Sequence, residues 1–511
     1  MSQPSDIPAP LPGASTLQHA SSQGHPPGLR TLFFTEMWER LSYYGMRALL
    51  VLFMVNEVKT GGMGLTDEMA TAIYGLYTAG VYLAALPGGW IADRLLGAQR
   101  AIWSGGILIA IGHFTMAIPR TESFFVGLLF VVLGTGLLKP NISALVGQLY
   151  PEGGARRDAG FTIFYMGINL GAAAGPLLCG WLGEKVNWHY GFAAAGLGMA
   201  LGLVQFRLTR HHLGGAGLTP DHHRATTRRD WTLVSVALGA LALVVALALA
   251  GVLVINPLKL GKVTAWLILA MAVGYFTWAF AFAGLASTEK KRVVVIAILF
   301  LASAMFWSGF EQAGSSLNLF GERHTQRIIP EGTAGLTTAY EVPASWFQSL
   351  NAIFVISLAP LVAGLWTWLA RRNASPSLTV KVAWGLMLLA AGFLVLSFGA
   401  RRAIDTGPVW PTWLIMTYFL HTVGELFLSP VGLSAVTKLA PPRLVGQMMG
   451  IWFLGTSLGN LIAGLFAGEV SGDKTAAMPE RFLQVVMTAG GVGLLLLLFT
   501  KPIRKLMTGV K

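Results

Sequence analysis

The chain has 511 residues, of which 54% are hydrophobic and only 12% are charged. A soluble globular protein carries about a quarter charged residues, so this balance excludes an ordinary soluble protein and predicts a polytopic membrane protein. A net charge of +13 is also typical of nucleic-acid-binding proteins. Here, however, the basic residues lie in short loops between apolar segments, so membrane topology accounts for them and we expect no nucleic-acid partner.

The first 29 residues are rich in proline, serine, glycine and glutamine, without the apolar core of a signal peptide. We expect residues 1–29 to form a disordered cytoplasmic tail. Cys179 is the only cysteine in the chain, which excludes an intrachain disulfide and a cysteine metal cluster. We therefore expect no metal site.

Apolar segments follow along the rest of the chain, and each crossing of a membrane needs about 20 mostly apolar residues. Lysine and arginine are about twice as frequent on one side of these segments as on the other, which predicts that both termini are cytoplasmic. Arg401 and Arg402 are exceptions on the opposite side. The fourteen predicted spans are centred within 31–56, 67–93, 99–119, 122–149, 158–184, 189–208, 231–255, 263–286, 293–320, 344–370, 378–400, 410–437, 444–468 and 481–500.

The longest cytoplasmic loop divides the spans into six and eight. The apolar parts of the seventh and eighth spans carry no charged residue, so we expect two lipid-facing helices added between two six-helix halves. The predicted organisation is a tail over 1–29, an N-terminal bundle over 30–208, a cytoplasmic loop over 209–230, two additional helices over 231–286, a C-terminal bundle over 287–502 and a cytoplasmic tail over 503–511.

A short motif, GGWIADRLLGAQR (residues 88–100), ends the second span and resembles the loop motif of the major facilitator superfamily. Its charged side chains can lock a short turn and bridge to a neighbouring helix; an ordinary basic loop is the alternative. The resemblance implies an all-α integral membrane protein with a major facilitator fold of two six-helix bundles. The residues that match the motif are Gly89, Asp93, Arg94, Gly97 and Arg100.

The first span carries four charged residues, Glu36, Glu39, Arg40 and Arg47. At 100° per residue they fall, together with Tyr43, on one stripe of the helix. A stripe of this charge cannot face lipid.

Three further charged residues, Lys139, Glu311 and Glu425, lie where their spans should be deepest. Each isolated charge costs about 2.5–3.5 kcal/mol to insert, so the seven groups are tolerated only if they pair and share a hydrated cavity. A purely structural role for a single ion pair, such as Glu36 with Lys139, remains open.

The signs of these seven groups suggest a class of cargo. Three cations and four carboxylates leave one negative charge, which one proton neutralises. A zwitterion preserves that balance, because the three cations can hold its carboxylate while Glu425 holds its ammonium group. This count does not separate peptides from amino acids.

Residues 36–47 (EMWERLSYYGMR) and residues 164–171 (FYMGINLG) are two of five separated motifs. Together these motifs resemble one family, the proton-dependent oligopeptide transporters. The first corresponds to its E-x-x-E-R-F-x-Y-Y-G signature and the second to its F-Y-x-x-I-N-x-G-S signature. Leu41 and Ala172 replace the Phe and Ser of these signatures and leave the charged set intact. The resemblance covers residues 30 to about 500, and some bacterial members similarly carry two additional helices. The other three motifs are GTGLLKPN around Lys139, FEQAGSSLN around Glu311, and the run Glu425–Ser429–Pro430.

The resemblance implies a proton-coupled symporter that imports di- and tripeptides by alternating access. It assigns the peptide carboxylate to Arg47 and Lys139, and the amino terminus to Glu425. It assigns proton coupling to Glu36, Glu39, Arg40, Lys139 and Glu311, and further peptide contacts to Tyr43, Tyr77, Asn169, Asn318, Trp307, Trp346, Ser429 and Trp452. Membrane packing is the alternative for the tryptophans.

Animal members of this family keep a proton-linked histidine near the second span. Residues 66–86 of this chain contain no histidine, and we expect His113 and His421 to be structural.

The chemistry of short peptides agrees with such a site. Backbone and termini are the features that all short peptides share, so a promiscuous site must bind them. Cargo held between cations of one half and acids of the other bridges the halves and favours an occluded state. If the peptide carboxylate captures Lys139, its former Glu partner loses a counter-ion and should take up a proton.

The sequence also leaves other classes of function open. The closest alternative is a transporter of the same fold for another solute, such as nitrate or a modified amino acid; a channel, scaffold or receptor is a more distant one. No nucleophile–His–acid motif, metal-ligand spacing or Walker sequence points to an enzyme. We further expect a monomeric, multi-pass protein of the bacterial inner membrane that needs no cofactor because the proton gradient drives it, with peptides, protons and the lipid bilayer as partners.

Overall fold

A computed structural model describes residues 24–152, 154–220, 228–333, 337–468 and 476–507. The expected N-terminal tail up to residue 23, residues 221–227 of the expected cytoplasmic loop, and residues 508–511 of the expected C-terminal tail lie outside these ranges. In the described chain a long helix stands at each of the fourteen predicted spans. Twelve of these helices are long and apolar enough to cross a membrane by composition alone. The other two are the first, which contains the charged stripe, and the third, which is less apolar because it includes Arg100 and His113.

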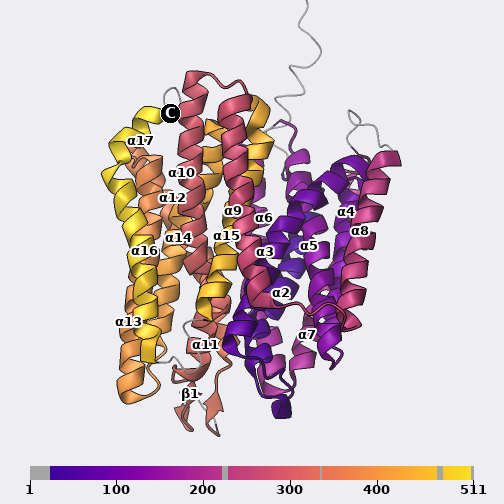
Figure 1. Ribbon diagram of the computed structural model, residues 1–511, viewed down its shortest axis with the longest axis vertical. Helices are drawn as coiled ribbons and strands as arrows, with labels where there is room; N and C mark the ends of the chain where they lie inside the picture. The colour runs from indigo at the N-terminus through magenta and orange to yellow at the C-terminus, as the bar shows by residue number, and fades with distance from the viewer. Residues whose placement is uncertain (1–23, 153, 221–227, 334–336, 469–475, 508–511) are drawn as a thin grey trace, which may run out of the picture.

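The N-terminal half is a bundle of six long helices, drawn in indigo to purple in Figure 1. α2 packs against α6 and α7, α4 against α5 and α7, and α3 against α5. Three short elements, η2 (Val58–Thr60), η3 (Ala92–Leu96) and η4 (Arg210–Leu213), join them. The long helices are α2 (Pro27–Val55), α3 (Asp67–Ile91), α4 (Ala98–Met116), α5 (Thr121–Gln148), α6 (Gly154–Lys185) and α7 (Trp188–Thr209).

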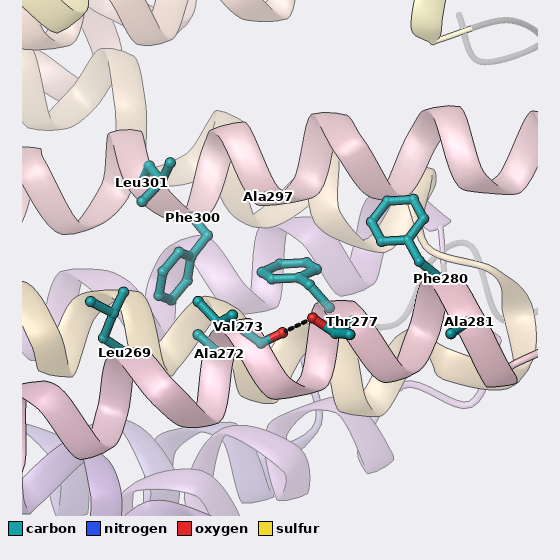
Figure 2. A pocket seen from close by; sticks show the side chains of 10 residues that line it. Leu269, Ala272, Val273, Thr277, Phe280, Ala281, Ala297, Phe300 and Leu301 are labelled. Atoms are coloured by element: carbon teal, nitrogen blue, oxygen red, sulfur yellow. Dashed lines mark hydrogen bonds between the residues drawn. The ribbon is translucent and has the colours of Figure 1, made fainter.

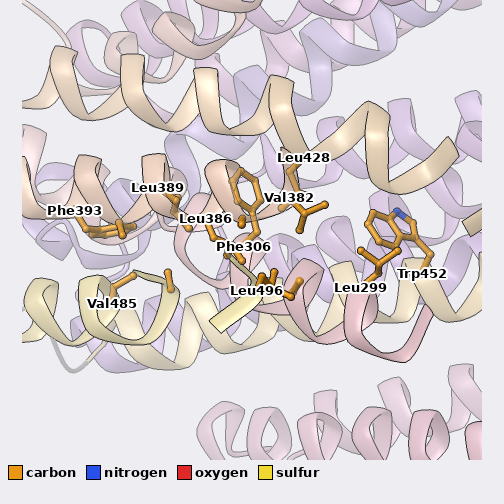
Figure 3. Packing of buried hydrophobic residues seen from close by; sticks show 14 of the residues in the cluster. Leu299, Phe306, Val382, Leu386, Leu389, Phe393, Leu428, Trp452, Val485 and Leu496 are labelled. Atoms are coloured by element: carbon orange, nitrogen blue, oxygen red, sulfur yellow. The ribbon is translucent and has the colours of Figure 1, made fainter. Parts of the chain in front are cut away.

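The C-terminal half repeats this plan around a separate apolar core, in which Phe306, Leu386, Leu389 and Phe393 interlock (Figure 3). Two two-residue strands, β1 (Ile328–Ile329) and β2 (Tyr340–Glu341), pair antiparallel; the sequence analysis did not predict them because they are too short to show a period. The helices are α10 (Ser287–Phe310), η5 (Glu311–Gly314), α11 (Ser316–Arg323), η7 (Ala344–Gln348), α12 (Ser349–Arg371), α13 (Leu378–Thr406), α14 (Thr412–Leu439), η8 (Pro442–Leu444), α15 (Val445–Ala467), α16 (Met478–Leu498) and α17 (Thr500–Leu506).

The ninth span, predicted within 293–320, is present over Ser287–Arg323, and the structure adds a break inside it that the sequence analysis did not predict. α10 ends at Phe310, and a 3₁₀ turn over Glu311–Gly314 separates it from α11. The Gln312 amide donates to the Ser308 carbonyl (3.1 Å) and accepts from the Ser316 hydroxyl (2.7 Å), so side chains hold the turn. At Gly314 a Cβ would collide with the Tyr74 hydroxyl, and glycine permits this close approach.

The two additional helices, α8 (Arg228–Leu249) and α9 (Pro257–Phe282), differ in burial. No residue in the apolar part of α8 is buried, as expected for a lipid-facing helix. For α9 that expectation is wrong on one face, because Ile268 and Ala272 are buried against α3 and α15 at the seam between the halves. Figure 1 shows α9 at this seam. Together with α10, α9 also forms a groove with a volume of about 560 Å³, and Figure 2 shows the side chains that line it.

The two ends of the molecule are distinct. Because the chain crosses an even number of times, α2 begins and α16 ends at the same end, which we call the termini end. The β1–β2 hairpin and η7 lie at the opposite end, the hairpin end (Figure 1). Cys179 lies within α6, fully buried against Gly45 of α2.

Candidate functional site

The first charged group of the site lies entirely on α2. Arg40 Nε is 3.0 Å from Glu36 Oε1 and also contacts Glu39 Oε2, and all three side chains are buried. The Arg40 guanidinium lies 5.2 Å from the centre of the Tyr43 ring. Glu36 lies three residues before Glu39 and four before Arg40, spacings that place side chains on the same face of a helix; Arg40 also reaches its sequence neighbour Glu39. We call Glu36, Glu39 and Arg40 the α2 triad.

The second charged group joins the two halves. Arg47 Nη2 is 2.8 Å from Glu311 Oε2, and both residues are at least 94% buried. Arg47 Nε donates to the Tyr74 hydroxyl (2.6 Å), which in turn donates to the Glu311 carbonyl at 3.5 Å. The 3₁₀ turn η5 brings Glu311 to α2 in this way. Tyr74 was missed in the sequence analysis, although its place one turn before Tyr77 was a usable signal.

Lys139 of α5 lies beside the α2 triad without pairing directly with it. Its ammonium nitrogen is 4.2 Å from the centre of the Tyr82 ring. Glu36 and Glu39 attract it and Arg40 repels it. Glu36 is paired with Arg40 rather than with Lys139, so the direct Glu36–Lys139 pair considered in the sequence analysis is not formed in this arrangement.

Glu425 of α14 is held by a neutral partner. Its Oε2 accepts a hydrogen bond from the Asn351 amide of α12 (2.9 Å), which also donates to the Thr422 hydroxyl (3.0 Å). Glu311 and Tyr165 are close enough to interact with it electrostatically. Asn351 was not among the predicted site residues, because a lone amide in an apolar span looks like a packing residue. Glu425 therefore has no basic side chain as its direct partner in the described chain.

The predicted site residues Asn169, Asn318 and Trp346 donate hydrogen bonds to backbone carbonyl groups. Asn318 donates to the Ala48 carbonyl (2.9 Å) and Trp346 Nε1 donates to the Leu177 carbonyl (3.0 Å), each contact joining the two halves. Asn169 donates to the Tyr165 carbonyl of its own helix (2.9 Å). Each side-chain amide carries two hydrogens and donates one of them here, so Asn169 and Asn318 can donate the second to a peptide backbone.

The aromatic residues divide into two groups. Tyr77 stacks on Tyr43 with ring centres 6.2 Å apart, beside the charged groups. Trp452 instead packs over Gly432 in the apolar core of the C-terminal half, where Figure 3 shows it next to Leu299. Its predicted role as a wall of the peptide pocket stays a prediction. Trp307 lies edge-on against Phe306 and Phe310, and Ser429 is half-buried on α14.

The halves are fastened together at the hairpin end. Arg323 of α11 donates two hydrogen bonds to the Asp67 carboxylate of α3, at 2.6 and 2.9 Å. The Glu184 carboxylate of α6 accepts from the backbone N–H groups of Ala344 and Ser345, at 2.8 and 2.9 Å. These contacts join the two halves at the hairpin end. Lys139 and Glu425, by contrast, are only partly buried.

Comparison with known proteins decides the family. The profile described as the POT family (PTR2) matches residues 99–478. The peptide transporter YePEPT of Yersinia enterocolitica is 43% identical over 96% of both chains, and a di-/tripeptide transporter of Lactococcus lactis is 37% identical over 96% of this chain and 98% of its own. A crystal structure of peptide transporter POT in complex with alafosfalin has a TM-score of 0.85 and 40% identity over 96% of this chain and 97% of its own.

The chain belongs to the POT family. The resemblance found in the sequence is therefore confirmed, and so is the major facilitator fold of two six-helix bundles with two helices between them. The protein is a membrane protein of a transporter family.

In this POT protein the loop motif is a bridge to α8. Asp93 and Arg94 of the motif lie in η3, a π-helical turn, whereas Arg100 lies in α4. Arg94 Nη1 is 3.6 Å from the buried Asp230 of α8. Gly97 has a φ of 78°, a conformation that favours glycine. The segment after α7 closes over the motif, where the Gln99 amide donates to the Ala216 carbonyl (2.7 Å). Gly89 lies near Pro140, and Arg100 is exposed.

Proposed function

We propose that this POT protein is a proton-coupled symporter that imports di- and tripeptides by alternating access. The names of its relatives support the cargo: two are a peptide transporter and a di-/tripeptide transporter, and a similar crystal structure contains alafosfalin. The observation that carries the proposal is the buried Arg47–Glu311 ion pair, which links the two halves inside the site.

Proton entry at Glu311 is the first coupled step. A neutral Glu311 no longer holds Arg47 as an ion pair, while Tyr74 keeps its hydrogen bond to Arg47. The freed guanidinium is a bidentate donor, so it binds the incoming peptide carboxylate. The proton thus binds Glu311 and the peptide carboxylate binds Arg47. Without peptide and proton, these two side chains pair with each other.

The α2 triad and Lys139 form the second coupled step. Two carboxylates share one guanidinium in the triad, which leaves a negative charge beside Lys139. When the peptide carboxylate also binds Lys139, the triad loses this nearby cation, and Glu36 or Glu39 takes up a proton.

The peptide amino terminus binds Glu425. This carboxylate lies in the C-terminal half and interacts with the neutral Asn351 amide, so an ammonium group gains a strong partner there without displacing a cation. A short peptide bound at both ends spans the two halves.

Transport requires the hairpin end to open. The Asp67–Arg323 contact and the Glu184 bonds to η7 must break as the halves rock, and the termini end must close. With both termini cytoplasmic, as the lysine and arginine bias indicates, the arrangement described above faces the cytoplasm. A monomer in the bacterial inner membrane suffices for this cycle, since each chain contains both halves.

Uptake into proteoliposomes tests the proposal. With an inward proton gradient we expect labelled Ala-Ala to accumulate, and N-acetylated Ala-Ala to compete weakly because it lacks the ammonium group for Glu425. Ala-Ala uptake that ignores the gradient contradicts proton coupling. Accumulation of nitrate or of a modified amino acid in place of Ala-Ala supports the alternative cargo.

A further inference from the structure

The groove between α9 and α10 opens outward from the molecule (Figure 2). The rings of Phe276 and Phe300 meet edge-on at its floor, 6.2 Å apart, and at its rim Val273 and Leu301 are 57% and 59% exposed. Its one polar side chain, Thr277, donates its hydrogen to the Val273 carbonyl (2.8 Å) and so offers the groove little polarity. The residues that line it are Leu269, Ala272, Val273, Phe276, Thr277, Phe280, Ala281, Ala297, Phe300 and Leu301.

The groove runs towards the termini end. α9 and α10 are antiparallel and joined by the short connection 283–286. Leu269 of α9 and Leu301 of α10 line one end of the groove, and Val273 and Ala297 line its middle. The same antiparallel register places Lys290 of α10 opposite Phe280 at the other end.

Lys290 lies on the groove side of α10. It precedes Ala297 by seven residues, which is two helical turns, so the two side chains project within about 20° of each other. Lys290 is exposed. Lys291, also exposed, projects about 100° further around the helix, away from the groove.

A second cation stands at the same mouth. Arg443 of η8 donates to the Gly284 carbonyl (2.9 Å), lies 3.7 Å from Glu289, and has a side chain that is 55% exposed. The Glu289 carboxylate is thus outnumbered by the basic side chains of Lys290, Lys291 and Arg443. The groove is apolar along its length and cationic at its mouth, which complements an acyl chain joined to an anionic headgroup.

We propose that this groove binds an anionic phospholipid from the leaflet at the termini end. One acyl chain lies between α9 and α10, and Lys290 and Arg443 bind the headgroup phosphate. One face of α9 packs at the seam between the halves. The lipid therefore binds to the opposite, outward-facing side of α9. This inference holds whichever solute the protein carries.

Native mass spectrometry of the detergent-purified protein tests the site, with phosphatidylglycerol and phosphatidylcholine of matched chains as probes. We expect one phosphatidylglycerol to be retained in preference to phosphatidylcholine. Lys290→Gln should lower its occupancy about fivefold, whereas Lys291→Gln, the matched control, should leave it within about twofold. Equal losses in the two variants, or equal retention of the two lipids, would overturn the headgroup site.

Filling the groove tests the acyl-chain part separately. Ala297→Phe should remove the retained lipid, and Thr277→Phe should do the same from the opposite wall, at an exposed position where folding tolerates bulk. Size-exclusion profiles identify a variant that fails to fold, and the other then decides. Undiminished phosphatidylglycerol binding in a folded groove-filling variant would overturn the proposal.

Discussion

Arg40 and Arg47 lie on the same helix, seven residues apart, and differ in where their partners come from. Arg40 pairs with Glu36 and Glu39 of its own helix, so this group persists however the halves are arranged. Arg47 pairs with Glu311 of the other half, so this pair exists only while the halves lie together at that level. A proton on the α2 triad changes local charge, whereas a proton on Glu311 changes how strongly the halves are joined.

Replacing one carboxylate in each group should give the largest difference in the free energy of unfolding. Glu311→Gln leaves Arg47 buried without a counter-ion, while Glu39→Gln leaves Arg40 with Glu36. Loss of one partner from a buried pair costs about 3–5 kcal/mol, so we expect Glu311→Gln to lower the free energy of unfolding by about 3 kcal/mol and Glu39→Gln by less than half as much. Thermal unfolding in detergent measures both, and equal losses contradict the contrast.

Transport by these two variants sharpens the same comparison. We expect gradient-driven accumulation of Ala-Ala to fall to the level of protein-free vesicles in both variants, because each loses a proton carrier. Exchange of peptide across the membrane without a gradient should persist in part. Normal acid-driven uptake by either variant contradicts its assigned role.

Lys139→Ala should also abolish driven uptake, because the lysine is the cation that the triad and the peptide carboxylate share. Unlike Glu311→Gln, it removes no direct ion pair, so we expect the free energy of unfolding to change by less than about 1 kcal/mol. Uptake of labelled Ala-Ala together with thermal unfolding tests both expectations. Unchanged uptake would show that the lysine is only structural.

Asp67→Asn should have a smaller effect, at the hairpin end. It weakens the contact with Arg323, a partly exposed pair worth about 1 kcal/mol, so we expect the population with an open hairpin end to rise about fivefold. Hydrogen–deuterium exchange at the beginning of α3 and in α11 should quicken accordingly. Arg402→Gln, an exposed change at the same end away from the seam, is the control, and equal quickening in both variants contradicts the assignment.

Replacing Glu341, at the hairpin end, should have the smallest effect on stability. The hydrogen bond from the Lys185 ammonium group holds the Glu341 pKa below its usual 4.5, with help from Arg327. A lowered pKa means that the contact stabilises the closed hairpin end above about pH 4.5 and is lost as the pH falls through the folded-state value. Because Glu341 is half exposed, solvent screens the contact. Glu341→Gln should remove this small acid-dependent loss of stability, and an unchanged pH profile contradicts it.

The sequence predicted those parts of the site that depend on helical spacing within one segment. The stripe from Glu36 to Arg47 follows from the helical period, and the structure buries its four charged residues. Lys139, Glu311 and Glu425 stood out because charge in an apolar span is costly.

The parts it did not predict depend on contacts between segments. The break at Glu311 is held by side-chain bonds of Gln312, which no hydrophobic pattern reveals. Tyr74 and Asn351 are neutral, so they carry no insertion penalty to mark them. The seam contact of α9 depends on where α3 and α15 pack, and its apolar sequence is equally suited to lipid.

The single buried thiol has a practical consequence. Cys179 is sealed between α6 and α2, and no other cysteine exists in the chain. Two cysteines introduced across the hairpin end, or across the termini end, would therefore be the sites that a spin label or fluorophore modifies, and Cys179 would not have to be replaced. Rocking of the halves can then be followed as paired distances in an otherwise unaltered protein.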